Sequence, residues 1–154
     1  MWIKNEDKKN YIDSKVNGLR LIFLDGVSNV ERASCKSFCD WLKRKYWFPI
    51  RIYIVFVPQK KFKSLDDGHY YYGIFYSNLA DKRFKYPRIC VAVHCKSDED
   101  VQNCYFTIAH ELTHYFQWYF YEDEKCSSRS LEIGANKWAR YIVDNYLRDV
   151  VNRK

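Results

Sequence analysis

Long apolar runs are absent from this chain of 154 residues. No stretch approaches the roughly 20 apolar residues that a membrane-spanning helix needs, so the sequence predicts no membrane partner. The amino-terminal stretch MWIKNEDKKN also lacks the apolar centre of a signal peptide. We therefore expect a cytoplasmic protein, or one that acts in the host cytoplasm if the gene is viral.

Zinc-finger spacing is absent too, because no two of the six cysteines form a C-x-x-C pair. Disulfides require an oxidising compartment, which nothing in the sequence indicates, although a thermophilic origin would reopen that alternative. Free cysteine often behaves as a small buried hydrophobe, so we expect buried free thiols. The cysteines are Cys35, Cys39, Cys90, Cys95, Cys104 and Cys126.

Internal repeats, low-complexity tracts and domain-separating linkers are also missing. The apolar fraction of 47% and the aromatic fraction of 19% argue against disorder. A chain of this length can bury a substantial core. Residues 1–154 are therefore interpreted as a single domain.

The net charge of +7 accompanies three basic clusters, Lys43 to Lys45, Lys60 to Lys63, and Lys82 to Lys85. Basic clusters can form a nucleic-acid footprint, so nucleic acid stays an open partner. A solubilising surface is the favoured interpretation, because the clusters lie in loops and at a helix end rather than along one stripe.

Four short segments have the composition of β-strands. They are rich in β-branched and aromatic residues and are bounded by glycines or polar stretches. Their ranges are 18–26, 50–57, 70–77 and 88–95. We expect them to form a small mixed sheet.

Three helices are expected around these strands. Ser28 and Glu31 form a capping box at the start of a helix over residues 29–46. Ser97 or Asp98 is expected to begin a second helix that ends near residue 121, and the third begins near Ser128. The predicted fold class is therefore α+β: a small mixed β-sheet with a helix before it and two helices after it.

The second helix carries His110-Glu111-x-x-His114. Residues four apart on a helix lie on one face, so both imidazoles can bind one ion, and imidazole suits zinc. Glu111 is rotated by about 100° from His110, which places it where a general base for water is needed. A purely structural histidine pair is the alternative, but it would not require a separate apolar face such as Ile108 and Leu112 provide.

A catalytic zinc site needs a third protein ligand and one open position. Glu122 is too far along the same helix, and Glu124 is farther still. The pattern H-E-x-x-H-x-x-G-x-x-H is absent, because Gln117 and Phe120 occupy its last two marked positions. The ligand must therefore come from another element.

Glu132 on the third helix is the candidate for this ligand. The chain between His114 and Glu132 is long enough to turn and bring an antiparallel helix alongside the first. Asn136 lies on the same face as Glu132 and could orient a ligand. An acid near a helix start can also serve the helix dipole alone, which is the alternative explanation.

The stretches TIAHELTHYF and LEIGANKWAR together resemble a gluzincin metallopeptidase, whose site combines HExxH with a downstream glutamate. Residues Glu132 to Ala139 resemble the E-x-x-A-N-x-F-A signature of ImmA/IrrE-like proteins and minigluzincins, with Trp138 in place of the usual phenylalanine. The resemblance covers Thr107 to Ala139, about a fifth of the chain.

This resemblance implies a zincin-like fold and Zn²⁺ as cofactor, with His110, His114 and Glu132 as ligands and Glu111 as general base. It also implies that the strand before the active-site helix forms the upper edge of the cleft. The segment 88–95 is the expected strand. Such an edge can bind an extended peptide by strand addition.

The sequence thus favours a zinc-dependent endopeptidase that hydrolyses peptide or protein substrates with a metal-activated water. Tyr141 and His94 are candidate hydrogen-bond donors to the transition state, although each could simply pack or lie at an edge. One alternative is a regulatory or DNA-associated protease of the ImmA/IrrE or SprT kind. Another is a non-catalytic zinc-stabilised domain, against which Glu111 argues because a structural site needs no base.

Two further features bear on access to the cleft. Some small gluzincins are held inactive by a terminal segment, and residues 1–10 or 148–154 could act in this way here. The aromatic run from Tyr115 to Tyr121 could form an apolar specificity wall, or it could pack in the core and between helices.

Overall fold

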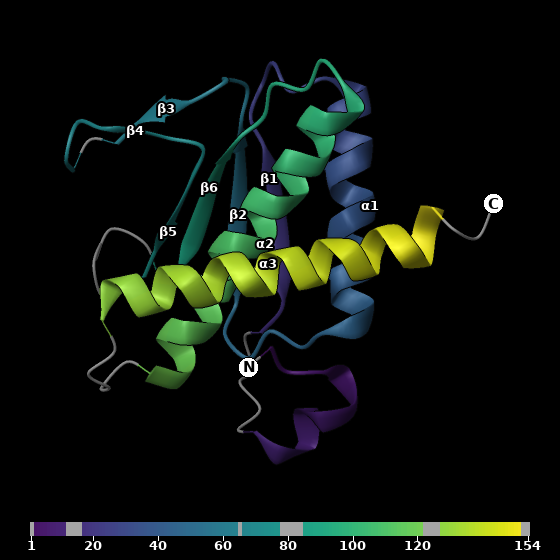
Figure 1. The fold of residues 1–154 in the computed structure, drawn as a ribbon, viewed down its shortest axis with the longest axis vertical. Coiled ribbons are helices and arrows are strands. Elements are labelled where there is room, and N and C mark those ends of the chain that lie inside the picture. Colours follow the sequence, from purple (N-terminus) through teal and green to yellow (C-terminus); the bar gives the residue numbers. More distant parts are fainter. Residues whose placement is uncertain (1, 12–16, 65, 78–84, 122–126, 152–154) are drawn as a thin grey trace.

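A mixed β-sheet with the strand order β1–β2–β6–β5 forms the centre of the protein (Figure 1). The computed structural model describes residues 2–11, 17–64, 66–77, 85–121 and 127–151. The strands β1 (Leu19–Phe23), β2 (Ile52–Val57) and β6 (Arg88–Ala92) run parallel, and β5 (Gly73–Tyr76) pairs antiparallel with β6. The small mixed sheet predicted from the sequence is confirmed.

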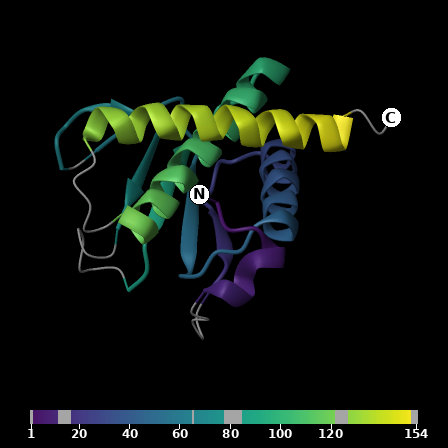
Figure 2. The same cartoon turned by 60° about the horizontal axis from the view of Figure 1, so that its bottom comes forward.

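In the described part of the chain, three α-helices and a short 3-10 helix accompany the sheet. They are η1 (Asn5–Asn10), α1 (Asn29–Lys45), α2 (Asp98–Tyr121) and α3 (Ser128–Val151). The helix α1 lies between β1 and β2 in the chain, and α2 and α3 follow β6, so the α+β class is confirmed. Figure 1 and Figure 2 both show α3 running back across α2 in the opposite sense.

One face of the sheet is buried beneath the helices. Ile54 and Phe56 of β2 are fully buried, whereas the residues between the buried positions of this strand are half-buried. The register places Ile54 beside Ile89 and Phe56 beside Val91, which are also fully buried. Because α2 packs on β5 and β6 and α1 packs on β1, this alternation marks the side that faces the helices.

Serine side chains begin each of the three α-helices. The hydroxyl of Ser28 accepts from the amide of Glu31 at 3.1 Å, and the Glu31 carboxylate accepts from the amide of Ser28 at 3.0 Å. Ser97 and Ser127 accept bonds of 3.2 and 3.1 Å from amides in the first turns of α2 and α3. These bonds satisfy amides that have no partner inside a helix, which explains why the helices start where the sequence predicts.

The helix α2 is anchored through the face that points away from the histidines. Ile108, Leu112 and Phe116 on this helix are fully buried. Trp2 packs against Phe116 with ring centroids 5.0 Å apart, and its indole nitrogen donates to the Thr113 hydroxyl at 3.1 Å. Trp2, which is far from α2 in sequence, therefore holds this face of the helix in place. The histidines lie on the opposite face.

The predicted strand over residues 70–77 is wrong in one respect, because the structure divides it at Tyr72. The first part, β4 (Tyr70–Tyr71), pairs with β3 (Phe62–Lys63) in a separate two-stranded sheet. The second part, β5, pairs with β6. The physical reason is that the two halves have different partners, so the chain must leave one ladder before it enters the other.

The sequence predicts that the cysteines are free thiols. The described cysteines, Cys35, Cys39, Cys90, Cys95 and Cys104, are free, and Cys126 lies outside the described residues. Burial raises the pKa of the Cys39 thiol well above its usual range, so this thiol remains protonated and apolar.

Within the described residues, no helix combines the length and apolar character that crossing a bilayer requires.

Candidate metal centre

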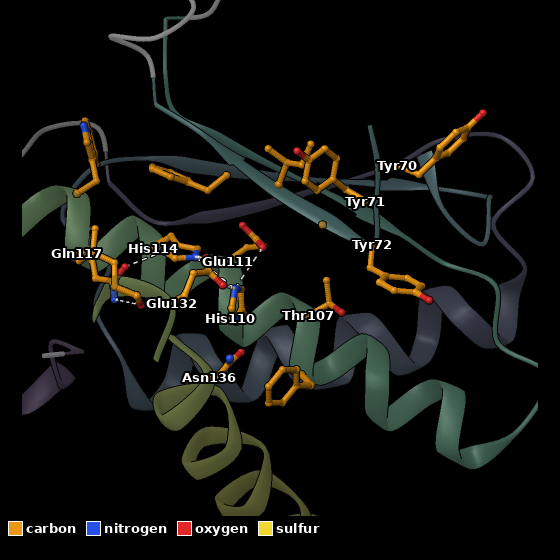
Figure 3. Close-up of a pocket in the computed structure, with 16 residues that line it drawn as sticks. Tyr70, Tyr71, Tyr72, Thr107, His110, Glu111, His114, Gln117, Glu132 and Asn136 are labelled. Carbon is orange, nitrogen blue, oxygen red and sulfur yellow. Dashed lines mark hydrogen bonds and ion pairs between the residues drawn. The ribbon is translucent and has the colours of Figure 1, made fainter. Parts of the chain in front are cut away.

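A cleft of about 810 Å³ opens between β5 and the helices α2 and α3 (Figure 3). The lining residues are Tyr70, Tyr71, Tyr72, Gly73, Ile74, Phe75, Phe106, Thr107, His110, Glu111, His114, Gln117, Trp118, Leu131, Glu132 and Asn136. None of these described lining residues is a lysine or an arginine, although the chain carries a net charge of +7. The cleft is therefore aromatic on its walls and carries its carboxylates and imidazoles on the helices.

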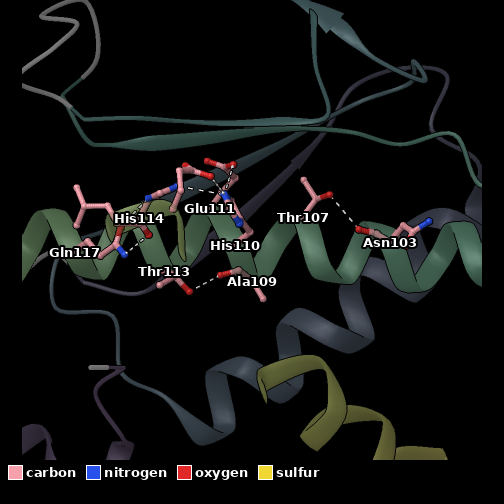
Figure 4. Close-up of polar contacts among 10 residues, drawn as sticks. Asn103, Thr107, Ala109, His110, Glu111, Thr113, His114 and Gln117 are labelled. Atoms are coloured by element: carbon pink, nitrogen blue, oxygen red, sulfur yellow. Dashed lines mark hydrogen bonds and ion pairs between the residues drawn. The ribbon is translucent and has the colours of Figure 1, made fainter. Parts of the chain in front are cut away.

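His110 and His114 lie on the face of α2 that is turned toward the strands, whereas Ala109 and Thr113 point the other way (Figure 4). The Nε2 atoms of the two imidazoles are 3.2 Å apart. Ligand atoms of His110, Glu111 and His114 all lie within 4.8 Å of one another, so this group could hold a metal ion. The spacing of four residues thus produces the common face that the sequence predicts.

Glu132 reaches the same point from α3. One carboxylate oxygen lies 2.7 Å from Nε2 of His114, and the other lies 3.3 Å from Nε2 of His110. A tetrahedral zinc ion with bonds of about 2.0–2.1 Å separates its ligand atoms by about 3.3–3.4 Å. The 3.2 Å between the two Nε2 atoms and the 3.3 Å between His110 and Oε2 of Glu132 are close to this separation, whereas the 2.7 Å between His114 and Oε1 of Glu132 is shorter. Two nitrogens and one carboxylate oxygen also form a ligand set that zinc accepts, and the residues present therefore fit a zinc ion.

Glu111 lies beside this triangle and is almost fully buried, with 7% of its surface exposed. Its carboxylate is 3.8 Å from Nε2 of His110. Burial raises the pKa of Glu111 to about 7, and the nearby Glu132 adds to the rise, while His114 and the backbone of Phe75 oppose it. A carboxylate whose pKa lies near neutrality can both accept and release a proton, as a general base must.

His110 is set up as a neutral ligand. Burial and the neighbouring His114 lower its pKa, while Glu132 and the side chain of Asn136 favour the protonated ring. Metal ligands must be deprotonated, so a lowered pKa favours binding of a cation. Nδ1 of His110 is buried and has no hydrogen-bond partner among the described residues. Asn136 lines the cleft near this ring, and its role in orienting a ligand stays a prediction.

The strand β5 lies directly over α2 at the level of the site, and glycine makes this approach possible. A Cβ atom at Gly73 would lie 2.5 Å from Cγ2 of Thr107 and 3.1 Å from Cγ of Glu111. Thr107 cannot simply rotate away, because its hydroxyl donates to the carbonyl oxygen of Asn103 at 3.0 Å. Any side chain at Gly73 would therefore push the strand away from the general base candidate.

The strand at the edge of the cleft is β5, which corrects the prediction for the segment 88–95. That segment forms β6, which lies between β2 and β5 and has no free edge. The antiparallel strand β5 is placed between β6 and the cleft, and its residues Gly73 to Phe75 line the cavity. The sequence order of the strands does not reveal this, because the strand nearest to α2 in the chain is not the outermost in space.

Tyr141 and His94, the two candidate donors to the transition state, do not line the cleft. Tyr141 is 53% exposed and lines a separate pocket of about 490 Å³ together with Trp41 and Asn145. His94 is exposed beyond the end of β6 and lines a third pocket with Cys95. The structure therefore does not bring either side chain to the candidate metal centre.

The aromatic run on α2 divides between two roles. Tyr115 and Phe116 are fully buried in the core, and the hydroxyl of Tyr115 bonds to the backbone of Ile50. Trp118 instead lines the cleft, where its ring lies 6.0 Å from that of Phe75. Core packing thus accounts for the first residues of the run, and one residue contributes to the wall of the cavity.

Neither terminal segment lines the cleft in its described part. Trp2 packs behind α2, and η1 follows it along the chain. At the other end, Asp149 on α3 accepts from the indole nitrogen of Trp41 at 3.0 Å and pairs with Lys45 at 3.3 Å. Residues 152–154, and the rejected ligands Glu122 and Glu124, lie outside the described residues.

Gln117 belongs to the site, although in the sequence it stands out only as a departure from another zinc pattern. Its side chain lies 2.7 Å from Nδ1 of His114 and donates to the carbonyl oxygen of Leu131 at 2.8 Å. The signal that could have identified it is its position three residues after His114, which places it on the same helix face.

Comparison of the chain with protein-family models, with curated proteins and with solved structures finds no match. The resemblance to gluzincins therefore rests on the motif residues between Thr107 and Ala139.

Proposed function

We propose that this protein is a zinc-dependent endopeptidase of the gluzincin type. The observation that carries the proposal is the convergence of three potential ligands from two helices at the floor of an open cleft. Nε2 of His110, Nε2 of His114 and the Glu132 carboxylate are separated by 2.7–3.3 Å. Glu111 stands next to them without being needed as a ligand.

The open geometry favours a catalytic site over a structural one. Structural zinc sites are closed by four protein ligands, whereas catalytic sites have three and leave one position for water or substrate. Here the Glu132 side chain is 57% exposed, and the ligands face a cavity of about 810 Å³. A domain that used zinc only for stability would need neither the cavity nor the buried carboxylate of Glu111.

Each polar residue of the site would have a distinct role. When bound, zinc would polarise the peptide carbonyl and lower the pKa of water to about 7. His110, His114 and Glu132 would hold it. Glu111 would accept a proton from the attacking water and pass it to the leaving amine, for which its place beside the ligands, 3.8 Å from Nε2 of His110, is suited.

The strand β5 would bind the substrate backbone. As the last strand of the sheet it pairs only with β6 among the described strands, and its residues line the cleft. An extended peptide can add to such an edge through main-chain hydrogen bonds. Aromatic walls would contact its side chains, and none of the described lining residues is a lysine or an arginine that could neutralise the phosphates of a nucleic acid.

Digestion of a peptide library by the zinc-loaded protein tests this proposal. We expect internal peptide bonds to be cleaved, with fragments identified by mass spectrometry. Cleavage should stop when a chelator removes the metal and return when zinc is restored, because the metal activates the attacking water. A zinc-loaded protein that leaves every peptide intact would contradict the activity.

A further inference from the structure

Gln117 is a buried polar residue whose two ends are both occupied. Only 4% of its surface is exposed, and a buried amide is costly unless its hydrogen bonds are made. One end meets Nδ1 of His114 at 2.7 Å, and the other meets the carbonyl oxygen of Leu131 at 2.8 Å. A single side chain on α2 thus contacts one proposed zinc ligand and the residue directly before another, Glu132.

The Leu131 contact decides how the Gln117 amide is oriented. A backbone carbonyl can only accept, so the amide nitrogen must face Leu131 and the amide oxygen must face His114. His114 must then donate from Nδ1, and Nε2 carries the lone pair. That lone pair points to the Glu132 carboxylate at 2.7 Å, where two acceptors need a proton or a metal ion between them.

The same bond ties the first turn of α3 to α2. Leu131 lies in that turn, one residue before Glu132, whose own side chain is 57% exposed and has little packing to restrain it. The backbone position of Glu132 relative to the histidines therefore depends on contacts between the helices. Gln117 provides such a contact beside the site.

We propose that Gln117 is the positioning residue of the metal centre: it sets the tautomer of His114 and holds the Glu132-bearing turn of α3 against α2. This inference rests on the metal site of the proposed function but not on peptide hydrolysis. Partners that orient metal-bound histidines typically change metal affinity by about 10–100-fold when they are removed. The effect should therefore appear in binding of zinc itself.

Two substitutions separate the two contacts. Gln117→Met has a similar shape and loses both hydrogen bonds, whereas Gln117→Glu keeps an acceptor for Nδ1 of His114 and loses the donor to Leu131. Thr113→Val is the matched control, because it also removes two buried hydrogen bonds, those with Trp2 and Ala109, on the opposite face of the same helix. Zinc affinity is measured by competition with a chromophoric chelator, and the His114 tautomer by nitrogen NMR of the imidazole.

We expect Gln117→Met to weaken zinc binding by about 10–100-fold and to lose the preference for the Nδ1–H tautomer. Gln117→Glu should keep that tautomer and bind zinc with intermediate affinity. If Gln117→Met does not fold, the zinc affinity of Gln117→Glu tests the inference instead. Thr113→Val should bind zinc like the wild type. Zinc affinity of Gln117→Met within twofold of the wild type, or an unchanged tautomer, overturns the inference. A wild-type protein that binds no zinc would instead refute the proposed function.

Discussion

Replacing Glu111 by Gln is expected to lower the rate of peptide cleavage by about 10²–10⁴-fold, which is the usual contribution of a positioned general base. The amide has nearly the same shape and can occupy the same buried space beside His110. It cannot accept the proton of the attacking water. Zinc affinity should stay within a few-fold of the wild type, because Glu111 is not one of the three proposed ligands.

The control for this variant is Glu99→Gln, which makes the same chemical change in the exposed first turn of α2. It should leave both cleavage and zinc binding unchanged. The measurement is the initial cleavage rate of one confirmed peptide at equal zinc occupancy of all three proteins. Wild-type rates in Glu111→Gln would remove this residue from the mechanism.

Replacing Glu132 by Ala is expected to weaken zinc binding by more than about 100-fold, since loss of a direct ligand should exceed the loss of a supporting partner. The stability of the metal-free protein should change by less than about 0.5 kcal/mol, as for most exposed positions. Zinc binding should weaken because the Glu132 side chain contacts the two histidines, and stability should change little because that side chain is 57% exposed.

Asp144→Ala on the same helix is the matched control, because it removes an exposed carboxylate elsewhere on α3. Zinc affinity is measured by chelator competition, and stability by urea unfolding of the metal-free proteins. If Glu132→Ala bound zinc as tightly as Asp144→Ala, the third ligand would have to be another group, and the site would no longer be of the gluzincin type.

The part of the site that lies on α2 could be predicted from the sequence because its determinants are local. Ser97 caps the helix, and Ile108 and Leu112 recur at helical spacing. Once the helix is assigned, its geometry alone places His110 and His114 together. Chain length and helix position made Glu132 a candidate ligand, and the resemblance of its surroundings to a known signature favoured it further.

The arrangement of the strands could not be predicted in the same way. Apart from Gly73, the run from Tyr70 to Tyr76 consists of β-forming residues, and the glycine by itself does not show that the chain changes partner strands at Tyr72. The break arises because the two halves pair with different strands, and because only Gly73 permits the close contact with Thr107. Such choices depend on partners that are distant in sequence.

Helix geometry alone places Tyr141 away from the metal centre, and this could have been recognised from the sequence. Tyr141 follows Glu132 by nine residues, and at about 100° per residue this is two and a half turns, so the two side chains lie on opposite sides of α3. Asn136 follows by four residues and shares the face of Glu132. The structure accordingly has Asn136 in the cleft and Tyr141 in another pocket.

Anomalous diffraction at the zinc edge from zinc-loaded crystals would test most directly whether α2 and α3 hold one ion between them. We predict a zinc ion within about 2.0–2.2 Å of Nε2 of His110, Nε2 of His114 and a carboxylate oxygen of Glu132. Zinc bound only elsewhere, for example at the thiols of Cys35 and Cys104, or a zinc ion at the histidines with Glu132 turned away and no protein group in its place, would contradict that prediction.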